Sequence, residues 1–245
     1  MAETLAQPIL AATPSAGLLG RAFGIIFSPR ATYAGIVARP RALGALLLIL
    51  LIMASGLTAF LSTEVGREAL LDQQVRQREA LGRPMTAEQT AQMERFLPYV
   101  RYVAAAGQVV SVVVIMLEVS GLMFTVFNAV LGGDGTFKQV FSVVVHSGFV
   151  IAAQQFVVLP LDYVRESMTS PTSLSVFAPF LEETSFAARF LGALDLSLMW
   201  WIVNLAIGLG VLYKRRTGPI ATSMFVTYLV IALVIAAIRS VLSGA

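Results

Sequence analysis

The chain has no cysteine, a single histidine and few charged residues. The absence of cysteine among its 245 residues excludes both a disulfide framework and a thiolate metal site. With His146 as the one histidine, a zinc site would need carboxylate ligands at a spacing that the sequence lacks, so we expect no metal and no cofactor. Charged residues make up 13% of the chain, against about 25% in soluble domains. Together with 57% hydrophobic residues, this composition indicates an integral membrane protein.

Enzyme motifs are also missing. The sequence contains no HExxH, GxSxG, Walker or dinucleotide-binding pattern. His146 and Ser147 are neighbours on a predicted helix and point in different directions, so they do not form a base–nucleophile pair. We therefore expect a protein that is not an enzyme, with no catalytic residues and no nucleic-acid partner.

Five apolar segments are long enough to cross a bilayer. Because lipid offers no partners to unpaired backbone groups, each segment is predicted to be helical. The predicted fold is an all-α integral membrane protein, with a membrane domain over residues 42–245. Its five transmembrane helices are expected at residues 42–61, 103–131, 139–159, 196–212 and 220–241.

Residues 62–99 between the first two spans are polar and mixed in charge. Gly82-Arg83-Pro84 is a break, and Thr86 and Gln89 have the spacing of a helix capping box. We expect an outer helical loop that continues the first span into water.

Residues 1–41 are predicted to be a cytoplasmic tail, of which residues 1–15 are mobile. Short amphipathic helices follow, and one of them places Leu19, Phe23 and Ile26 on one face. The coincidence of apolar and basic residues favours helices that lie at the interface and bind anionic lipid headgroups. An ordinary cytoplasmic flank is the plainer alternative. The basic residues are Arg21, Arg30, Arg39 and Arg41.

The distribution of charge predicts the orientation. The number of basic residues alone does not decide it, but the tail and the turns at 132–138 and 213–218 carry almost purely basic charge. The basic residues of the 62–99 loop are instead balanced by acids. By the positive-inside rule we expect the amino terminus in the cytoplasm and the carboxyl terminus outside.

Polar residues inside the second span repeat at steps of three, four and seven, which places them on one helix face. Such a stripe is expected to face other helices or a cavity, and a lipid-facing Glu118 would contradict the assignment of this span. The stripe consists of Gln108, Ser111, Glu118, Gly121, Thr125, Asn128 and Gly132.

The second and third spans are joined by a glycine turn, Gly132-Gly133-Asp134-Gly135, whose glycines suit positive φ angles. In a straight antiparallel hairpin, Glu118 and His146 would differ in depth by roughly 8 Å. We therefore predict two polar layers. One pairs Glu118 with Gln154 or Gln155, and the other pairs His146 with Asn204 or Ser142.

Two functions are compatible with these layers. They either fix helix packing, with Glu118 as a neutral hydrogen-bond donor, or provide a proton or ion path through Glu118 with His146 as a relay.

Several segments resemble the Yip (Ypt-interacting protein) family of five-span membrane proteins, in its bacterial branch. The similarity covers roughly residues 18–240 and lies in the segments Ser28-Pro29-Arg30-Ala31-Thr32, Arg39-Pro40-Arg41 and Gly132 to Gln139, and in Asp195, Trp200, Asn204 and Gly208.

The resemblance implies a five-span helical protein with a cytoplasmic amino terminus and no catalytic residues. We expect a non-enzymatic scaffold or membrane-organising component of the bacterial cytoplasmic membrane, which associates with itself or with other membrane proteins. The alternative is a small proton, ion or solute transporter or channel subunit that uses Glu118.

Overall fold

The chain forms a helical bundle in the computed structural model, which describes residues 17–79, 82–182 and 185–242. Within these ranges there is no strand, only an isolated antiparallel bridge between Ser173 and Asp195. The first sixteen residues of the predicted tail lie outside the described residues.

Four helical segments are long and apolar enough to cross a membrane, by length and composition. The protein is therefore an all-helical membrane protein that crosses the bilayer several times. The four segments are α3 (Leu43–Leu61), α5 (Ala87–Phe124) with the π-helix η1 (Thr125–Val130), α6 (Phe137–Ser147) with α7 (Phe149–Val164), and α10 (Thr217–Leu242).

A fifth apolar helix, α9 (Leu196–Leu212), has 17 residues and lies inside the bundle. It packs against α2 (Pro29–Ala38), α6 and α10. Leu205, Ala206 and Leu209 on this helix are fully buried, so its apolar sequence serves the core of the bundle.

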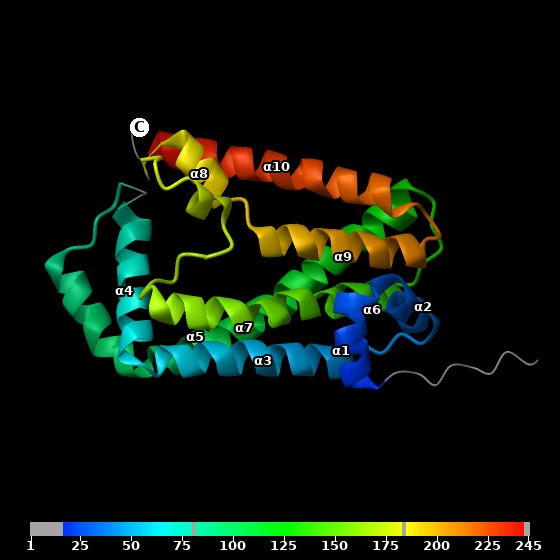
Figure 1. The fold of residues 1–245 in the computed structure, drawn as a ribbon, viewed down its shortest axis with the longest axis horizontal. Helices are drawn as coiled ribbons and strands as arrows, with labels where there is room; N and C mark the ends of the chain where they lie inside the picture. Colours follow the sequence, from blue (N-terminus) through cyan, green and yellow to red (C-terminus); the bar gives the residue numbers. More distant parts are fainter. Residues whose placement is uncertain (1–16, 80–81, 183–184, 243–245) are drawn as a thin grey trace, which may run out of the picture.

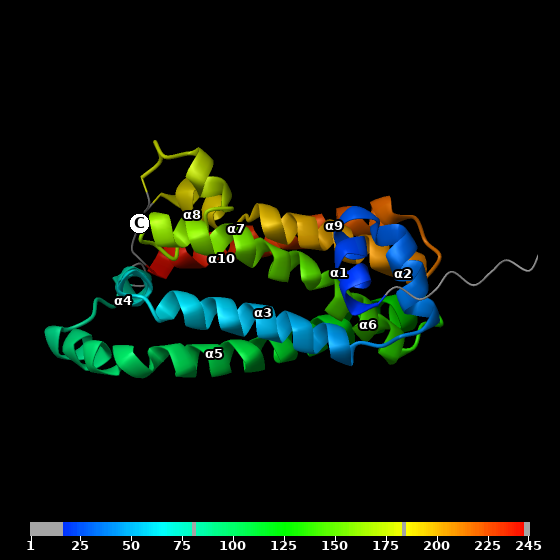
Figure 2. The same cartoon turned by 60° about the horizontal axis from the view of Figure 1, so that its bottom comes forward.

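The long helices lie side by side, and the connections gather at the two ends of the bundle (Figures 1 and 2). At the end that we call the amino-terminal end are α1 (Leu18–Phe27), α2, the α5–α6 turn and the α9–α10 turn. The opposite end, called the far end, carries α4 (Glu64–Glu79), η2 (Leu174–Phe177) and α8 (Phe186–Gly192). The final described helix, α10, also ends there.

The 62–99 loop is helical, but it does not continue the first span. α4 turns away at the end of α3 and runs across the bundle end (Figure 1). Thr63 makes this corner, because its hydroxyl donates to Phe60 O at 2.6 Å and accepts from Gly66 N at 3.0 Å. Gly66 is required because a Cβ there would collide with the Phe60 carbonyl.

The second arm of that loop and the second span form one uninterrupted helix. α5 starts with the predicted capping box, in which Thr86 Oγ1 accepts from Gln89 N at 3.3 Å. It then runs through Pro98 without a break. The predicted start of the second span, near residue 103, therefore lies inside this helix and marks no change of secondary structure.

The third span is divided into α6 and α7 at Gly148. A Cβ at Gly148 would lie 2.5 Å from Met116 Cε and 3.3 Å from Ile49 Cδ1. Gly148 therefore allows α3 and α5 to approach closely. Pro160, the residue directly after the predicted end of this span at 159, lies inside α7.

Candidate functional site

The two amino-terminal helices are held in the bundle by Asn204 of α9. Tyr33 on α2 is fully buried, and its hydroxyl donates to Asn204 Oδ1 at 2.9 Å. Asn204 Nδ2 in turn donates to Ile25 O on α1 at 3.0 Å. Burial raises the pKa of Tyr33 well above its ordinary value, so the hydroxyl remains a neutral donor.

Space for the Tyr33 ring comes from Gly208, one helical turn after Asn204. A Cβ at Gly208 would lie 2.9 Å from Tyr33 Cε1 and 2.5 Å from Val143 Cγ1. α2 therefore packs against α9 at a place where α9 has no side chain. Nothing in the local periodicity around Tyr33 indicates this contact.

His146 does not pair with Asn204. The ring is fully buried, and Nδ1 lies 2.7 Å from Ser142 O, one turn earlier on α6. Because a carbonyl only accepts, Nδ1 carries the proton. His146 Nε2 and Ser142 Oγ are both buried without a hydrogen-bond partner among the described residues. The predicted layer of His146 with Asn204 or Ser142 is thus replaced by two separate contacts. Asn204 binds Tyr33, and His146 binds the backbone of Ser142.

Glu118 lies on the exposed outer face of α5, and the predicted layer with Gln154 or Gln155 does not form. Gln154 Nε2 donates to Thr172 Oγ1 at 3.4 Å, and Gln155 Oε1 lies near Gly56 of α3. The layer fails because α3 packs against both α5 and α7, whereas the depth count assumed that α5 and α7 are direct neighbours. Among the described residues Glu118 has no hydrogen bond or ion pair.

An outward-facing Glu118 does not contradict the assignment of the second span, since the segment Ala87–Val130 still has the length and hydropathy of a membrane span. The expectation that an outward-facing Glu118 contradicts the span assumed that its neighbour is lipid. Contact with another chain is an alternative that is compatible with the span.

The glycine turn lies against Tyr213, which follows α9. Only Gly132 has a positive φ, of 65°, so positive φ explains one of its glycines. A Cβ at Gly133 would lie 2.7 Å from the Tyr213 ring, and one at Gly135 would lie 2.9 Å from it. Close approach of the tyrosine ring is therefore the reason for the other two.

Asn128, in the π-helix η1, completes this contact. Its Nδ2 donates to Gly135 O at 2.5 Å, and its Oδ1 accepts from the Tyr213 hydroxyl at 2.8 Å. The Tyr213 ring also stacks on Phe127 with centroids 4.6 Å apart. Burial, and then the charge of Asp134, raise the pKa of Tyr213. This cluster fastens the α5–α6 turn to the α9–α10 turn.

The amino-terminal helices form as two short helices, and α1 presents an apolar stripe outward. Leu19, Phe23 and Phe27 are 65%, 64% and 78% exposed, while Ile25 faces the core. The basic residues differ in placement. Arg21 is half-buried, with Nε buried and unpartnered among the described residues, whereas Arg30, Arg39 and Arg41 are exposed.

At the far end, Asp195 joins the 165–195 segment to α9. Its Oδ1 accepts from Ser197 N at 2.8 Å, which caps α9. Its Oδ2 accepts from the hydroxyls of Ser170 at 2.5 Å and Thr172 at 2.8 Å. The Tyr228 hydroxyl of α10 accepts from Asp195 N at 2.9 Å. The sequence signal for this cluster was an aspartate directly before an apolar helix.

These polar groups mainly connect helices and turns. Within the described ranges, no three His, Cys, Asp or Glu residues gather as a metal site. The contacts of Asn204, Asn128 and Asp195 each join segments that are distant in sequence.

The chain matches a protein-family model. The family model described as Yip1 domain matches residues 23–238, from α1 into α10. No curated protein and no solved structure matches the chain.

Proposed function

The chain belongs to the Yip1 domain family, and from that premise we propose that it is a non-enzymatic scaffold that assembles with its own copies in the bacterial cytoplasmic membrane. In this proposal α9 is a fifth span, the amino terminus is cytoplasmic and the carboxyl terminus is outside. The 17 residues of α9 fall at the lower end of the usual range of about 17–25 for a membrane helix. An odd number of spans agrees with α1 and the end of α10 lying at opposite ends of the bundle.

The scaffold proposal rests on an exposed face of α5 and of the first residue of η1. We call this face the exposed stripe, and it differs from the polar stripe predicted from the sequence. Gly107, Ser111, Val114, Glu118 and Thr125 are all exposed. At 3.6 residues per turn they lie within about 60° of one another around the helix. Ser111, Glu118 and Thr125 are seven residues apart, a spacing that keeps a seam facing a partner helix.

A stripe of this composition is unfavourable against lipid. An ionisable residue in mid-membrane costs about 2.5–3.5 kcal/mol on insertion scales and usually faces protein or water. Small and hydroxyl-bearing residues are enriched where membrane helices touch. A second copy related by a two-fold axis along the membrane normal would place Ser111, Glu118 and Thr125 opposite their own counterparts. There the carboxyl group of Glu118 would find hydrogen-bond partners.

Transport receives less support, because Glu118 lies on the outside of the bundle and apart from the buried residues Ser142, His146 and Asn204. A proton path would require these groups to be connected.

The absence of native cysteine allows a direct test by disulfide crosslinking in membranes. Ser111→Cys and Thr125→Cys place single thiols on the stripe. Leu51→Cys on α3 and Val230→Cys on α10 are matched controls, since these side chains are 66% and 53% exposed. We expect crosslinked dimers from the first two variants only. Equal crosslinking at all four positions, or none on the stripe, contradicts the proposal.

Glu118 variants then separate scaffold from transporter. Glu118→Gln keeps a hydrogen-bonding group and is expected to keep Thr125→Cys crosslinking, whereas Glu118→Leu is expected to weaken it. A pH-dependent flux in reconstituted vesicles that disappears with Glu118→Gln while crosslinking persists would instead favour transport.

A further inference from the structure

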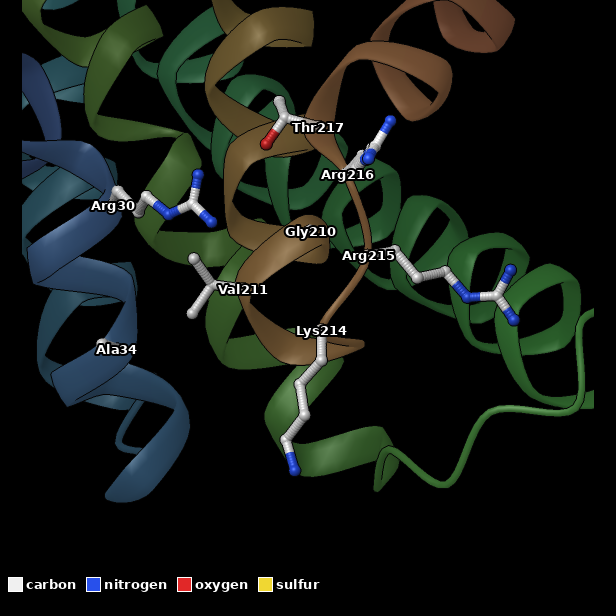
Figure 3. Close-up of a pocket in the computed structure, with 8 residues that line it drawn as sticks. All are labelled: Arg30, Ala34, Gly210, Val211, Lys214, Arg215, Arg216 and Thr217. Atoms are coloured by element: carbon white, nitrogen blue, oxygen red, sulfur yellow. The ribbon is translucent and has the colours of Figure 1, made fainter.

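A pocket of about 570 Å³ opens at the amino-terminal end of the bundle, between α2 and the α9–α10 turn (Figure 3). α2 contributes Arg30 and Ala34, and the last turns of α9 contribute Gly210. Thr217, the first residue of α10, lies at its edge. None of its lining residues belongs to α5, so the pocket is independent of the stripe on which the proposed function rests.

The lining carries four basic side chains and no acidic one. Arg30, Lys214 and Arg216 are exposed, and none of these three side chains has a hydrogen bond or ion pair within the part of the chain that the structure describes. Arg215 donates to Leu131 O at 2.8 Å and turns away from Arg30 (Figure 3). The Arg30, Lys214 and Arg216 side chains extend in different directions from the lining (Figure 3), and together they give the pocket a positive potential that attracts an anion.

The backbone conformation of the α9–α10 turn determines where its basic side chains lie. Lys214 adopts a left-handed φ of 51°, and Arg215 N donates to Gly210 O at 2.9 Å. A Cβ at Gly210 would lie 3.0 Å from Thr217 Oγ1, so the turn closes tightly over α9. The positive end of the dipole of α10, a helix of 26 residues, therefore lies at the edge of the pocket.

Arg30 completes the pocket from the opposite side. Its guanidinium extends from α2 towards Gly210 and Thr217 (Figure 3). α2 is held in place by the buried Tyr33 on the same helix, which fixes the distance between Arg30 and the turn.

The pocket also opens at the bundle end where membrane helices begin, and a bilayer places its headgroups at the ends of its spans. The described spans α3 and α10 begin at this end of the bundle, and α1 carries its exposed Leu19, Phe23 and Phe27 there. Arginine and lysine donate several charge-assisted hydrogen bonds to a phosphate from different directions. We propose that this pocket binds a phosphate group, carried by an anionic lipid headgroup or by a soluble phosphate compound.

Native mass spectrometry of the full chain in detergent tests the proposal, with phosphatidylglycerol, phosphatidylcholine and inorganic phosphate as probes. Arg30→Gln and Arg216→Gln should each weaken binding of phosphatidylglycerol about tenfold, because each removes a charge-assisted hydrogen-bond donor to the phosphate. Arg39→Gln is the matched control, because Arg39 is also exposed and flanks α2 but does not line the pocket. It should change binding less than about twofold, because its exposed charge lies outside the pocket and is screened by water and salt.

Ala34→Phe gives a second test that keeps every charge. The larger side chain would fill the pocket, so lipid binding should fall although the net charge is unchanged. If Arg39→Gln acts as strongly as Arg30→Gln, and Ala34→Phe has no effect, the attraction is diffuse and the pocket proposal is overturned.

The probes also distinguish the two sources of phosphate. Displacement of phosphatidylglycerol by millimolar inorganic phosphate assigns the pocket to a soluble phosphate compound, and retention of the lipid assigns it to a headgroup. If phosphatidylglycerol binds no more tightly than phosphatidylcholine and inorganic phosphate does not bind, the proposal is wrong.

Discussion

The hydroxyl of Tyr33 donates a hydrogen bond of 2.9 Å to Asn204 Oδ1, across 171 residues of sequence. Because Asn204 also binds Ile25 O, one side chain of α9 holds both amino-terminal helices. The position of α1 and α2, and with it that of Arg30, depends on this contact.

Tyr33→Phe should destabilise the protein by about 1–2 kcal/mol, because it leaves the buried Asn204 Oδ1 without a donor. The measurement is the free energy of unfolding in detergent. Tyr163→Phe is the control, since that ring is 49% exposed. A double-mutant cycle with Asn204→Leu should give a clear coupling energy, and additive effects would refute the contact.

Gly208→Ala should destabilise the protein by about 1–3 kcal/mol through overpacking. The new methyl would press on Val143 and on the Tyr33 ring, and would move α2 away from α9. Gly35→Ala on α2 is the control, because no atom lies within 4 Å of a Cβ there. It should leave stability unchanged or raise it slightly. The melting temperatures of the two variants should therefore move apart, and equal shifts would contradict the packing described.

Tyr213 should make the protein sensitive to alkaline pH. Its folded pKa lies above the ordinary value of 10.0 because of burial and of Asp134. The raised pKa favours the neutral hydroxyl in the folded state. The stabilisation is therefore complete below pH 10 and is lost as the pH rises from there through the folded pKa.

Above about pH 10, we expect the melting temperature of Tyr213→Phe to fall less steeply with pH than that of the wild type. Asp134→Asn should reduce the alkaline loss without abolishing it, since burial remains. Since Tyr33 is present in every variant, differences among the three curves report on Tyr213. Parallel curves for all three proteins would show that Tyr213 does not contribute.

Asp195→Ala should destabilise the start of α9 by about 1–2 kcal/mol through the loss of its cap. It also leaves the hydroxyls of Ser170 and Thr172 without their acceptor. Faster amide exchange is expected at residues 170–173 and 196–198. Asp195→Asn, which retains a good cap, should change exchange less at 196–198 than at 170–173. Unchanged exchange in both segments for Asp195→Ala would disprove this role.

The membrane helices could largely be predicted because span length and hydropathy follow directly from bilayer thickness. The helix predicted at residues 196–212 coincides with α9, since Asp195 caps its start and the basic turn follows its end. Its length falls below that of the four candidate membrane spans. The break inside the third span was missed. Gly148 is needed there only because α3 and α5 approach it, and that approach is tertiary.

The candidate site was predictable in part only. Glu118, His146, Asn128 and Asn204 were recognised as unusual, but their partners depend on which helices are neighbours. A depth count along one hairpin carries no information about α3 lying against both α5 and α7. Tyr33 and Tyr213 were missed because a single aromatic residue near a membrane boundary has no distinctive local pattern.

The separation between Tyr33 and Asn204 has a consequence for biosynthesis. The separation of 171 residues takes roughly ten to thirty seconds to translate at about 5–20 residues per second. During that time α1 and α2 have left the ribosome while their anchor has not been made. The amino-terminal helices must therefore wait, held only by lipid or by an assisting factor, until α9 has been inserted.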